Sequence, residues 1–371
     1  MGIRFNRDSK RATNGPMIFF SDPSAEIDLQ DEIRGAIDSR LSFYAYRRPG
    51  DMMVSFGSSE TIAEGIGVPG FVIAPFHPSA TAVTIPWKPT CDCKRPYAEN
   101  ATFPQKSTTF EEYALEIRKI KELLGNNPDT KVVASRVACI DGNIDVAATF
   151  SRLCREYPSA FVFAFATPVT GCWIGASPEL LLCGTAGKLE TMALAGTREC
   201  GKEMEWDVKN TIEQRIVSGY ISDCLESNGI TPLLGKTFSR PAGGIEHICT
   251  PISADIPSDF NADRLRGLLK DLSPTPAVCG YPKDLALDTI SRLELHDRGC
   301  YGGFCGPYSG PADFSFYVNL RCATIESSRY AMFAGGGITS RSSENEEWTE
   351  TELKMKTLGY ALADDREIKN I

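Results

Sequence analysis

The alternation of apolar and polar residues predicts several amphipathic helices. Over residues 110–124 the apolar side chains recur at the helical period, so they share one face of a predicted helix. Thr108 and Glu111 have the spacing of a capping box at its start, and Gly125 follows its last apolar residue. Similar spacing predicts further helices at residues 145–156, 206–227 and 344–363.

Continuous apolar runs predict the strands. They lie at residues 41–47, 70–75, 131–140, 161–166, 172–177, 314–325 and 330–334. Two more apolar runs between residues 180 and 195 flank a Gly-Thr-Ala-Gly sequence at 184–187, which predicts a hairpin. We expect the three glycines at 335–337 to form a turn and the polar residues 86–106 to form a surface loop or lid.

The order of these elements favours one α+β domain. Strands come in runs with a few long helices between them, which is not the pattern of a regular βαβ array. No linker, repeat or low-complexity segment interrupts the 371 residues, so we expect a single domain over residues 1–371.

The composition is that of a globular protein, with 42% hydrophobic and 23% charged residues. The 48 acidic and 39 basic residues give a net charge of −9, which argues against a nucleic-acid-binding protein. No stretch is long and apolar enough for a membrane helix, and the amino terminus lacks the apolar run of a signal peptide. We therefore expect a cytoplasmic protein without a nucleic-acid or membrane partner.

The 13 cysteines are scattered singly, apart from the pair Cys91 and Cys93, and their number is odd. We expect reduced, mostly buried thiols rather than a disulfide or zinc framework. With only three histidines in the chain, a catalytic zinc is disfavoured, and carboxylates holding a hard cation fit the composition better.

Three glutamates are candidates for such a cation site. Glu347, Glu350 and Lys354 share one face of the carboxyl-terminal helix, a pattern that also fits a solvated acidic face with an internal salt bridge. Glu213, by contrast, lies within the apolar stripe of the helix at 206–227, where an unpaired carboxylate would be costly. A Mg²⁺ ion between Glu213 and Glu350 would remove that cost.

Lys131 and Glu179 are candidates for acid–base chemistry, because both stand in apolar surroundings. Burial lowers the pKa of a lysine and raises that of a glutamate, which suits one to act as a general base and the other as a general acid. The alternative is a solvent-exposed Lys131 and a Glu179 paired with an arginine such as Arg136.

Nine motifs occur in order along the chain, at residues 131–136, 175–180, 193–198, 246–250, 274–282, 301–304, 319–322, 334–338 and 347–351. They resemble those of the chorismate-utilising enzymes, the family of isochorismate, salicylate, anthranilate and aminodeoxychorismate synthases. The resemblance covers roughly residues 105–365, and residues 1–105 show only faint resemblance.

The resemblance implies a domain of two large, mostly antiparallel sheets packed together with helices outside. It also implies a Mg²⁺-dependent isochorismate synthase, in which the lysine at Lys131 activates water for attack at ring carbon 2. Relatives that use ammonia usually lack this lysine. Leu194 and Ala277 resemble the isochorismate synthases, whereas salicylate synthases tend to have threonine at the position of Ala277.

The resemblance also implies a role for each residue of this chain that matches a functional position of the family. The resemblance makes Glu179 the general acid that protonates the departing C4 hydroxyl, and it makes Glu213 and Glu350 the Mg²⁺ ligands. Glu347 would reach the metal directly or through water. The remaining residues would bind the substrate: Arg321 and Tyr301 the enolpyruvyl carboxylate, Gly335, Gly336, Gly337 and Lys354 the ring carboxylate, and Gly196, Thr197 and His247 the ring.

Two departures from the family pattern stand out. Gln214 follows Glu213 where the family usually has histidine, and residues 342–345 read Ser-Ser-Glu-Asn where Asp-Pro is common. Neither removes a residue with a chemical role.

Other functions remain as alternatives. A salicylate synthase is the second candidate, followed by an anthranilate or aminodeoxychorismate synthase. A non-catalytic chorismate-binding scaffold would be expected to lack some of Lys131, Glu179, Glu213 and Glu350, and all four are present. We expect chorismate as the small-molecule substrate, no amidotransferase subunit, and a monomer or homodimer whose product feeds menaquinone or siderophore synthesis.

Overall fold

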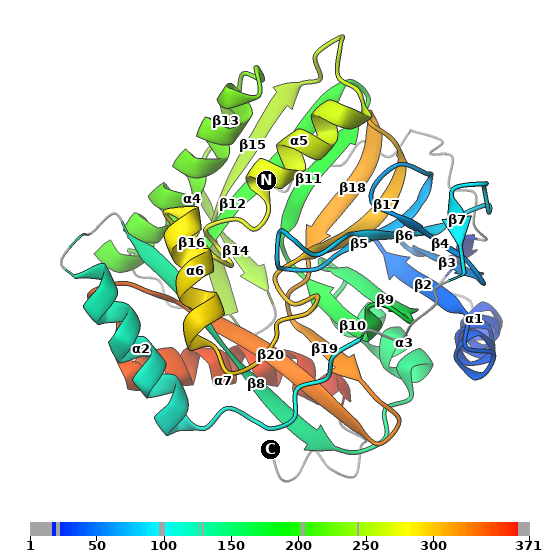
Figure 1. The fold of residues 1–371 in the computed structure, drawn as a ribbon, viewed down its shortest axis with the longest axis horizontal. Coiled ribbons are helices and arrows are strands. Elements are labelled where there is room, and N and C mark those ends of the chain that lie inside the picture. Colours follow the sequence, from blue (N-terminus) through cyan, green and yellow to red (C-terminus); the bar gives the residue numbers. More distant parts are fainter. Residues whose placement is uncertain are drawn as a thin grey trace.

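The computed structural model describes residues 17–19, 23–95, 101–125, 127, 130–201, 205–242 and 245–362. Two large antiparallel sheets pack face to face, and helices lie on their outer sides (Figure 1). This confirms the α+β architecture that the family resemblance implied.

Within the described residues the first sheet has nine strands, with the short strand at residues 17–19 at one edge. Their order is β1 (Met17–Phe19), β3 (Met53–Ser59), β2 (Ser42–Arg47), β9 (Phe161–Thr167), β10 (Gly171–Ser177), β19 (Cys322–Ile325), β20 (Arg329–Ile338), β8 (Lys131–Asp141) and β16 (Gly280–Tyr281).

In the part of the chain that the structure describes, the second sheet has eleven strands. Their order is β13 (Leu233–Leu234), β15 (Ile245–Asp255), β12 (Lys188–Glu199), β11 (Leu180–Thr185), β18 (Asp313–Val318), β17 (Phe304–Gly310), β5 (Gly70–Ala74), β6 (Val83–Pro86), β4 (Ile62–Glu64) and β7 (Cys93–Lys94), with β14 (Phe238–Ala242) also pairing with β15.

Aromatic residues from both sheets fill the layer between them. Phe161 of the first sheet stacks on Tyr317 of the second with ring centroids 4.0 Å apart, and Tyr44 stacks on Phe71 at 5.1 Å. All four side chains are buried. Offset aromatic pairs add to the stabilisation from burial alone, so this layer joins the two sheets firmly.

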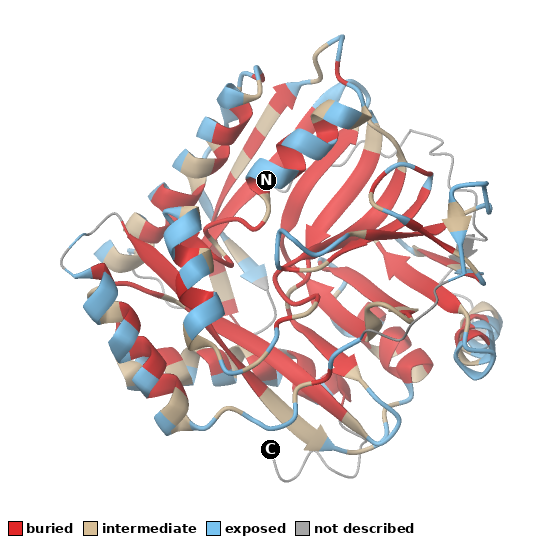
Figure 2. Cartoon of the chain, in the orientation of Figure 1, coloured by how far each residue is buried: buried red, intermediate tan, exposed pale blue. Residues whose placement is uncertain are grey.

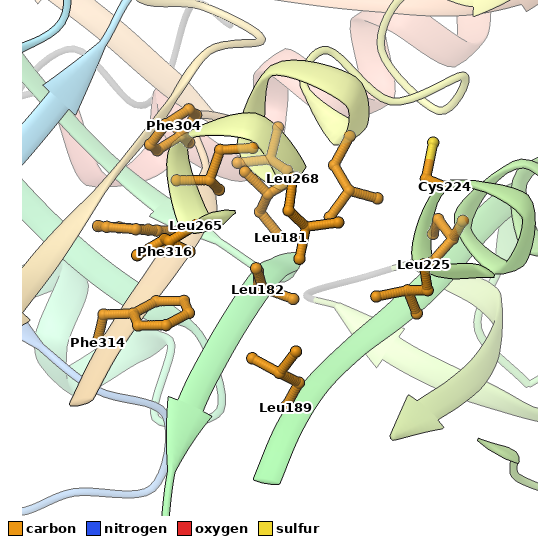
Figure 3. Packing of buried hydrophobic residues seen from close by; sticks show 14 of the residues in the cluster. Leu181, Leu182, Leu189, Cys224, Leu225, Leu265, Leu268, Phe304, Phe314 and Phe316 are labelled. Atoms are coloured by element: carbon orange, nitrogen blue, oxygen red, sulfur yellow. The ribbon is translucent and has the colours of Figure 1, made fainter. Parts of the chain in front are cut away.

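Seven helices in the described residues cover the outer faces. They are α1 (Pro23–Asp38), α2 (Phe110–Leu124), α3 (Val146–Glu156), α4 (Val208–Ser227), α5 (Ala262–Leu272), α6 (Lys283–Leu293) and α7 (Glu344–Leu362). Their inner faces are buried and their outer faces are exposed (Figure 2). Leu225 of α4 and Leu265 of α5, for example, belong to one apolar cluster with Leu181 and Phe316 of the second sheet (Figure 3).

The predicted helices are confirmed to within two residues at their ends. The capping box of α2 is formed by Thr109 and Glu112, one residue beyond the predicted pair, and Gly125 ends the helix as expected. The hairpin at 184–187 joins β11 to β12. Periodicity did not identify α1, α5 and α6.

Two predictions about strands were wrong. The apolar run at 314–325 is not one strand: it divides into β18 and β19, which lie in different sheets, because the chain turns at Arg321 with φ of 49°. The three glycines at 335–337 do not form a turn but continue β20, where they pair with residues 133–135 of β8.

Other predictions concern loops, thiols and membranes. Part of the segment 86–106 is strand, since β7 pairs with β4, and residues 96–100 lie outside the described part. All 13 cysteines are free thiols, as expected. None of the described helices is long and apolar enough to cross a membrane.

Candidate active site

One cavity brings most of the predicted site residues together. Its lining includes residues of β8 and β20 in the first sheet, of β12 and β15 in the second, and of helices α4 and α7. Figure 1 shows where these elements lie in the fold. The predicted residues that line it are Lys131, Glu179, Gly196, Thr197, Glu213, His247, Ala277, Tyr301, Arg321, Gly335, Gly337, Glu350 and Lys354.

Lys131 is the first residue of β8, and its side chain is buried in this cavity. Its Nζ lies 3.8 Å from Glu213 Oε2, which reaches across from α4. Gly337 on the neighbouring strand makes room for both, because a Cβ there would collide with Lys131 Cε and stand 2.7 Å from Glu213 Oε1. Gly337 therefore allows the side chains of Lys131 and Glu213 to lie directly against the backbone of β20.

Glu179 lies between β10 and β11 and is buried at 3% exposure. Burial raises the pKa of its carboxyl to about 8, although Lys131, Arg240 and Lys354 favour the charged form. Glu179 is therefore protonated at neutral pH and can donate a proton. The alternative pairing with Arg136 is excluded, because Arg136 donates to Thr351 Oγ1 at 2.6 Å and stacks on Trp348.

The three glutamates predicted to hold Mg²⁺ each lie beside a lysine. Besides the Lys131–Glu213 pair, Lys354 Nζ lies 2.7 Å from Glu350 Oε1, and Lys209 Nζ lies 2.6 Å from Glu347 Oε1. Among the described residues no three acidic, histidine or cysteine side chains form a preassembled metal site.

The donor set nevertheless suits a hard cation. Glu347 is 1% exposed, and its Oε2 is a buried oxygen without a hydrogen-bond partner among the described residues. Burial, with the charge of Glu350, raises the pKa of Glu347 although Lys209 opposes this. Burial also disfavours the charged form of Glu350, but Lys354 and Lys209 outweigh it and lower that pKa. Carboxylate oxygens of this kind are the ligands that Mg²⁺ prefers.

Glu347 and Gly336 do not line the cavity. Side chains alternate across a strand, so Gly335 and Gly337 face the cavity while Gly336 faces helices α2 and α7. A Cβ at Gly336 would collide with Glu347 Oε2 and approach the Tyr113 hydroxyl to 3.5 Å. Gly336 therefore makes space for Glu347. The predicted contact of Gly336 with the substrate has no support from the geometry.

His247 is neutral and oriented by its neighbours. Its Nδ1 donates to the carbonyl oxygen of Gly196 at 2.7 Å, which leaves Nε2 as the acceptor for Arg321 Nη2 at 3.2 Å. Burial and the adjacent Arg321 lower the pKa of His247 to about 3. Thr197 Oγ1 also lies 3.2 Å from Nδ1.

Arg321 and Tyr301 also line the cavity, and Arg321 lies beside His247. Arg321 is buried, and burial lowers its pKa to about 10, so the guanidinium remains charged at neutral pH. Tyr301 is buried and stacks on Phe333 with ring centroids 5.4 Å apart. A buried cation beside a phenolic hydroxyl suits recognition of a carboxylate.

Several residues that support the site were not predicted. Asn210 Oδ1 accepts from the Thr197 amide at 3.1 Å, and Gln214, in the place of the usual histidine, donates to Ala193 O and Thr250 Oγ1. Lys209 precedes Glu213 by one helical turn, a spacing that could have identified it.

Comparisons with known proteins agree with the motifs. A family model described as chorismate binding enzyme matches residues 88–363. The isochorismate synthase EntC of Escherichia coli K12 is 30% identical over 275 residues, which cover 70% of this chain and 68% of EntC. The isochorismate synthase MenF of Bacillus subtilis is 31% identical over 254 residues, covering 64% of this chain and 52% of MenF.

Solved structures share the fold. The menaquinone-specific isochorismate synthase MenF of Escherichia coli has a TM-score of 0.71 at 19% identity, with 87% of this chain and 89% of MenF covered. Anthranilate synthase component I of Streptococcus pneumoniae has a TM-score of 0.61 at 15% identity, with 96% and 95% covered. The chain belongs to the chorismate-binding enzyme family.

Proposed function

We propose that this protein is an isochorismate synthase, which converts chorismate into isochorismate. Relatives at about 30% identity, EntC and MenF, are isochorismate synthases. The observation that carries the proposal is that Lys131 and the protonated Glu179 line the same cavity. A base and an acid on one cavity suit a displacement in which water enters the ring and a hydroxyl leaves it.

The step balances without any other reactant. Lys131 Nζ takes a proton from a water molecule while the water oxygen bonds to ring carbon 2. The ring double bonds shift, the bond from carbon 4 to its hydroxyl breaks, and Glu179 gives its proton to that hydroxyl, which leaves as water. One water enters and one leaves, so product and substrate are isomers.

Arg321 and Tyr301 would bind the enolpyruvyl carboxylate. Lys354 and the backbone of Gly335 and Gly337 would face the ring carboxylate, and Gly196, Thr197 and His247 would hold the ring. His247 is neutral and the adjacent Arg321 is charged, so Arg321 is the group of this pair that is suited to bind a carboxylate.

A Mg²⁺ ion held by Glu213 and Glu350, with Glu347 directly or through water, is part of the proposal. When bound, it would supply positive charge that neutralises and polarises the ring carboxylate of the dianionic substrate. Among the described residues Glu347 Oε2 is buried and has no hydrogen-bond partner, which supports a cation bound by this carboxylate.

Ala277 favours isochorismate synthase over the second candidate, salicylate synthase. It lines the cavity as a small apolar side chain without a hydroxyl. Incubation of the protein with chorismate and Mg²⁺, with the products separated by chromatography, tests the choice. Accumulation of isochorismate is the expected result, and salicylate with pyruvate would contradict it. Ammonium added to the assay is expected to give no anthranilate or aminodeoxychorismate.

We also propose a cytoplasmic monomer or homodimer that works without an amidotransferase subunit. Relatives of both kinds, menaquinone-specific and vibriobactin-specific, have the isochorismate synthase activity. The product would therefore feed menaquinone or siderophore synthesis, and the genes that neighbour this one would distinguish the two.

A further inference from the structure

The three glutamates of the proposed metal site are matched by three lysines, and one lysine has no role in the chemistry above. Lys131 and Lys354 line the cavity, where they serve the water and the ring carboxylate. Lys209 does not line the cavity, yet it forms the closest of the three ion pairs, 2.6 Å from Glu347 Oε1. Its function must therefore lie in its contact with Glu347.

Lys209 lies one helical turn before Glu213 on α4, so the two side chains share a face of that helix. Its ion pair with Glu347 connects α4 to α7. Burial favours a lower pKa for Lys209, but Glu347, Glu213 and Glu350 outweigh it and raise the pKa. The ammonium thus lies in the field of all three carboxylates that are proposed to bind Mg²⁺.

Glu347 depends on this lysine in the metal-free protein. Its carboxylate is 1% exposed, Oε1 accepts from Lys209, and Oε2 has no partner among the described residues. Removing the partner of a buried charge is strongly destabilising. A metal ion could replace the lysine as the compensating charge, but both cations at one carboxylate would repel each other.

We propose that Lys209 is the resident counter-ion of this carboxylate cluster, which Mg²⁺ displaces from Glu347. The lysine keeps Glu347 in place before the metal binds, and its displacement lowers the affinity of the site for Mg²⁺. Lys209 is a positioning residue, since it acts through Glu347. The inference rests on the proposed Mg²⁺ site and adds how the metal-free and metal-bound states are balanced.

The experiment measures Mg²⁺ binding to the protein by titration calorimetry, without substrate. The variants are Lys209→Met, Lys209→Gln and Lys209→Arg, and circular dichroism establishes that each is folded. Lys188→Met is the matched control, because Lys188 also forms an ion pair, with Asp255, but on an exposed hairpin. Melting temperatures in EDTA and in excess Mg²⁺ give a second readout that does not depend on activity.

We expect Lys209→Met and Lys209→Gln to bind Mg²⁺ at least about tenfold more tightly than the wild type, equal to about 1.4 kcal/mol. In EDTA both variants should have a lower melting temperature than the wild type. Excess Mg²⁺ should raise their melting temperature by more than it raises that of the wild type. Lys209→Arg and Lys188→Met should bind Mg²⁺ as the wild type does.

Two outcomes would overturn the inference and they are distinguishable. If the wild type binds Mg²⁺ and both neutral variants bind it equally or more weakly, Lys209 does not compete with the metal, and the proposed function is unaffected. If none of the proteins binds Mg²⁺, the metal site of the proposed function fails together with this inference.

Discussion

The end of the Lys131 side chain lies directly against the backbone of Gly337 on the neighbouring strand. A Cβ at Gly337 would stand 3.0 Å from Lys131 Nζ and 2.7 Å from Glu213 Oε1. Lys131 also lines the cavity, so a methyl group at residue 337 would push the end of its side chain away from its place beside Glu213. The position of the proposed base therefore depends on the absence of a side chain at residue 337.

Gly337→Ala tests this dependence. We expect it to lower kcat by about a hundredfold or more, the usual contribution of acid–base catalysis, because the added methyl displaces Lys131. Gly267→Ala is the control: Gly267 lies exposed in α5 with open space around its Cβ position, so alanine there should raise stability slightly and leave the rate unchanged. Normal turnover by Gly337→Ala would contradict the assigned geometry.

Lys131→Ala is expected to abolish turnover while chorismate still binds, because Arg321, Tyr301 and Lys354 remain to hold the two carboxylates. The measurements are the steady-state rate and chorismate binding by quenching of intrinsic fluorescence. A rate above about a hundredth of the wild-type value would argue against the role of base.

The pH dependence of kcat/KM should report Glu179. Its carboxyl acts as an acid and must be protonated, and burial raises its pKa to about 8. Activity should therefore persist through neutral pH and fall about tenfold per pH unit above about pH 8, since the protonated fraction falls at that rate. Glu179→Gln should lose at least about a hundredfold in rate together with this limb. A profile that stays level to pH 10 would exclude Glu179 as the acid.

Elements of the fold could be predicted from the sequence wherever one local signal, such as helical periodicity or a stop glycine, was strong. The amphipathic stripe and the stop glycine of α2 are local signals that packing did not overrule. The division of residues 314–325 could not be predicted, because both β18 and β19 are buried and apolar, and only the left-handed conformation of Arg321 separates them.

The geometry of the site could likewise be predicted from local sequence only in part. Their apolar surroundings and the family resemblance identified Lys131, Glu179 and Glu213. The three glycines at 335–337, by contrast, were expected to form a turn, since glycine signals loops more often than close packing. Their pairing with β8 depends on contacts between segments some two hundred residues apart, which local pattern does not encode. The spacing of Glu350 and Lys354 indicated their ion pair, whereas the contacts of Lys131 with Glu213 and of Lys209 with Glu347 join different elements and became visible only in three dimensions.

Glu213→Gln should raise the Mg²⁺ concentration needed for half-maximal activity steeply, by about tenfold or more, because a neutral amide is a weaker ligand than a carboxylate. Activity over a Mg²⁺ titration measures this. Glu190→Gln, a change on β12 away from the cavity, is the control and should leave the titration unchanged. If Glu213→Gln gives the wild-type Mg²⁺ curve, Glu213 is not a ligand.

A buried ion pair behind the cavity should control its shape. Arg298 donates from Nε to Glu294 Oε2 at 2.8 Å, and to the carbonyl oxygens of Val133 and Val278 at 2.7 Å each. Both valines line the cavity, and Arg298 and Glu294 are buried. Arg298→Met removes the arginine partner of the buried Glu294 and leaves it the Ser135 amide, which donates to its Oε1 at 2.8 Å, and His296 at 3.9 Å. We therefore expect a loss of about 3 kcal/mol in the free energy of unfolding by urea. The double variant Arg298→Met with Glu294→Met removes both charges and should lose less than Arg298→Met alone. A double variant as unstable as the sum of the two single variants would mean that the two side chains act independently.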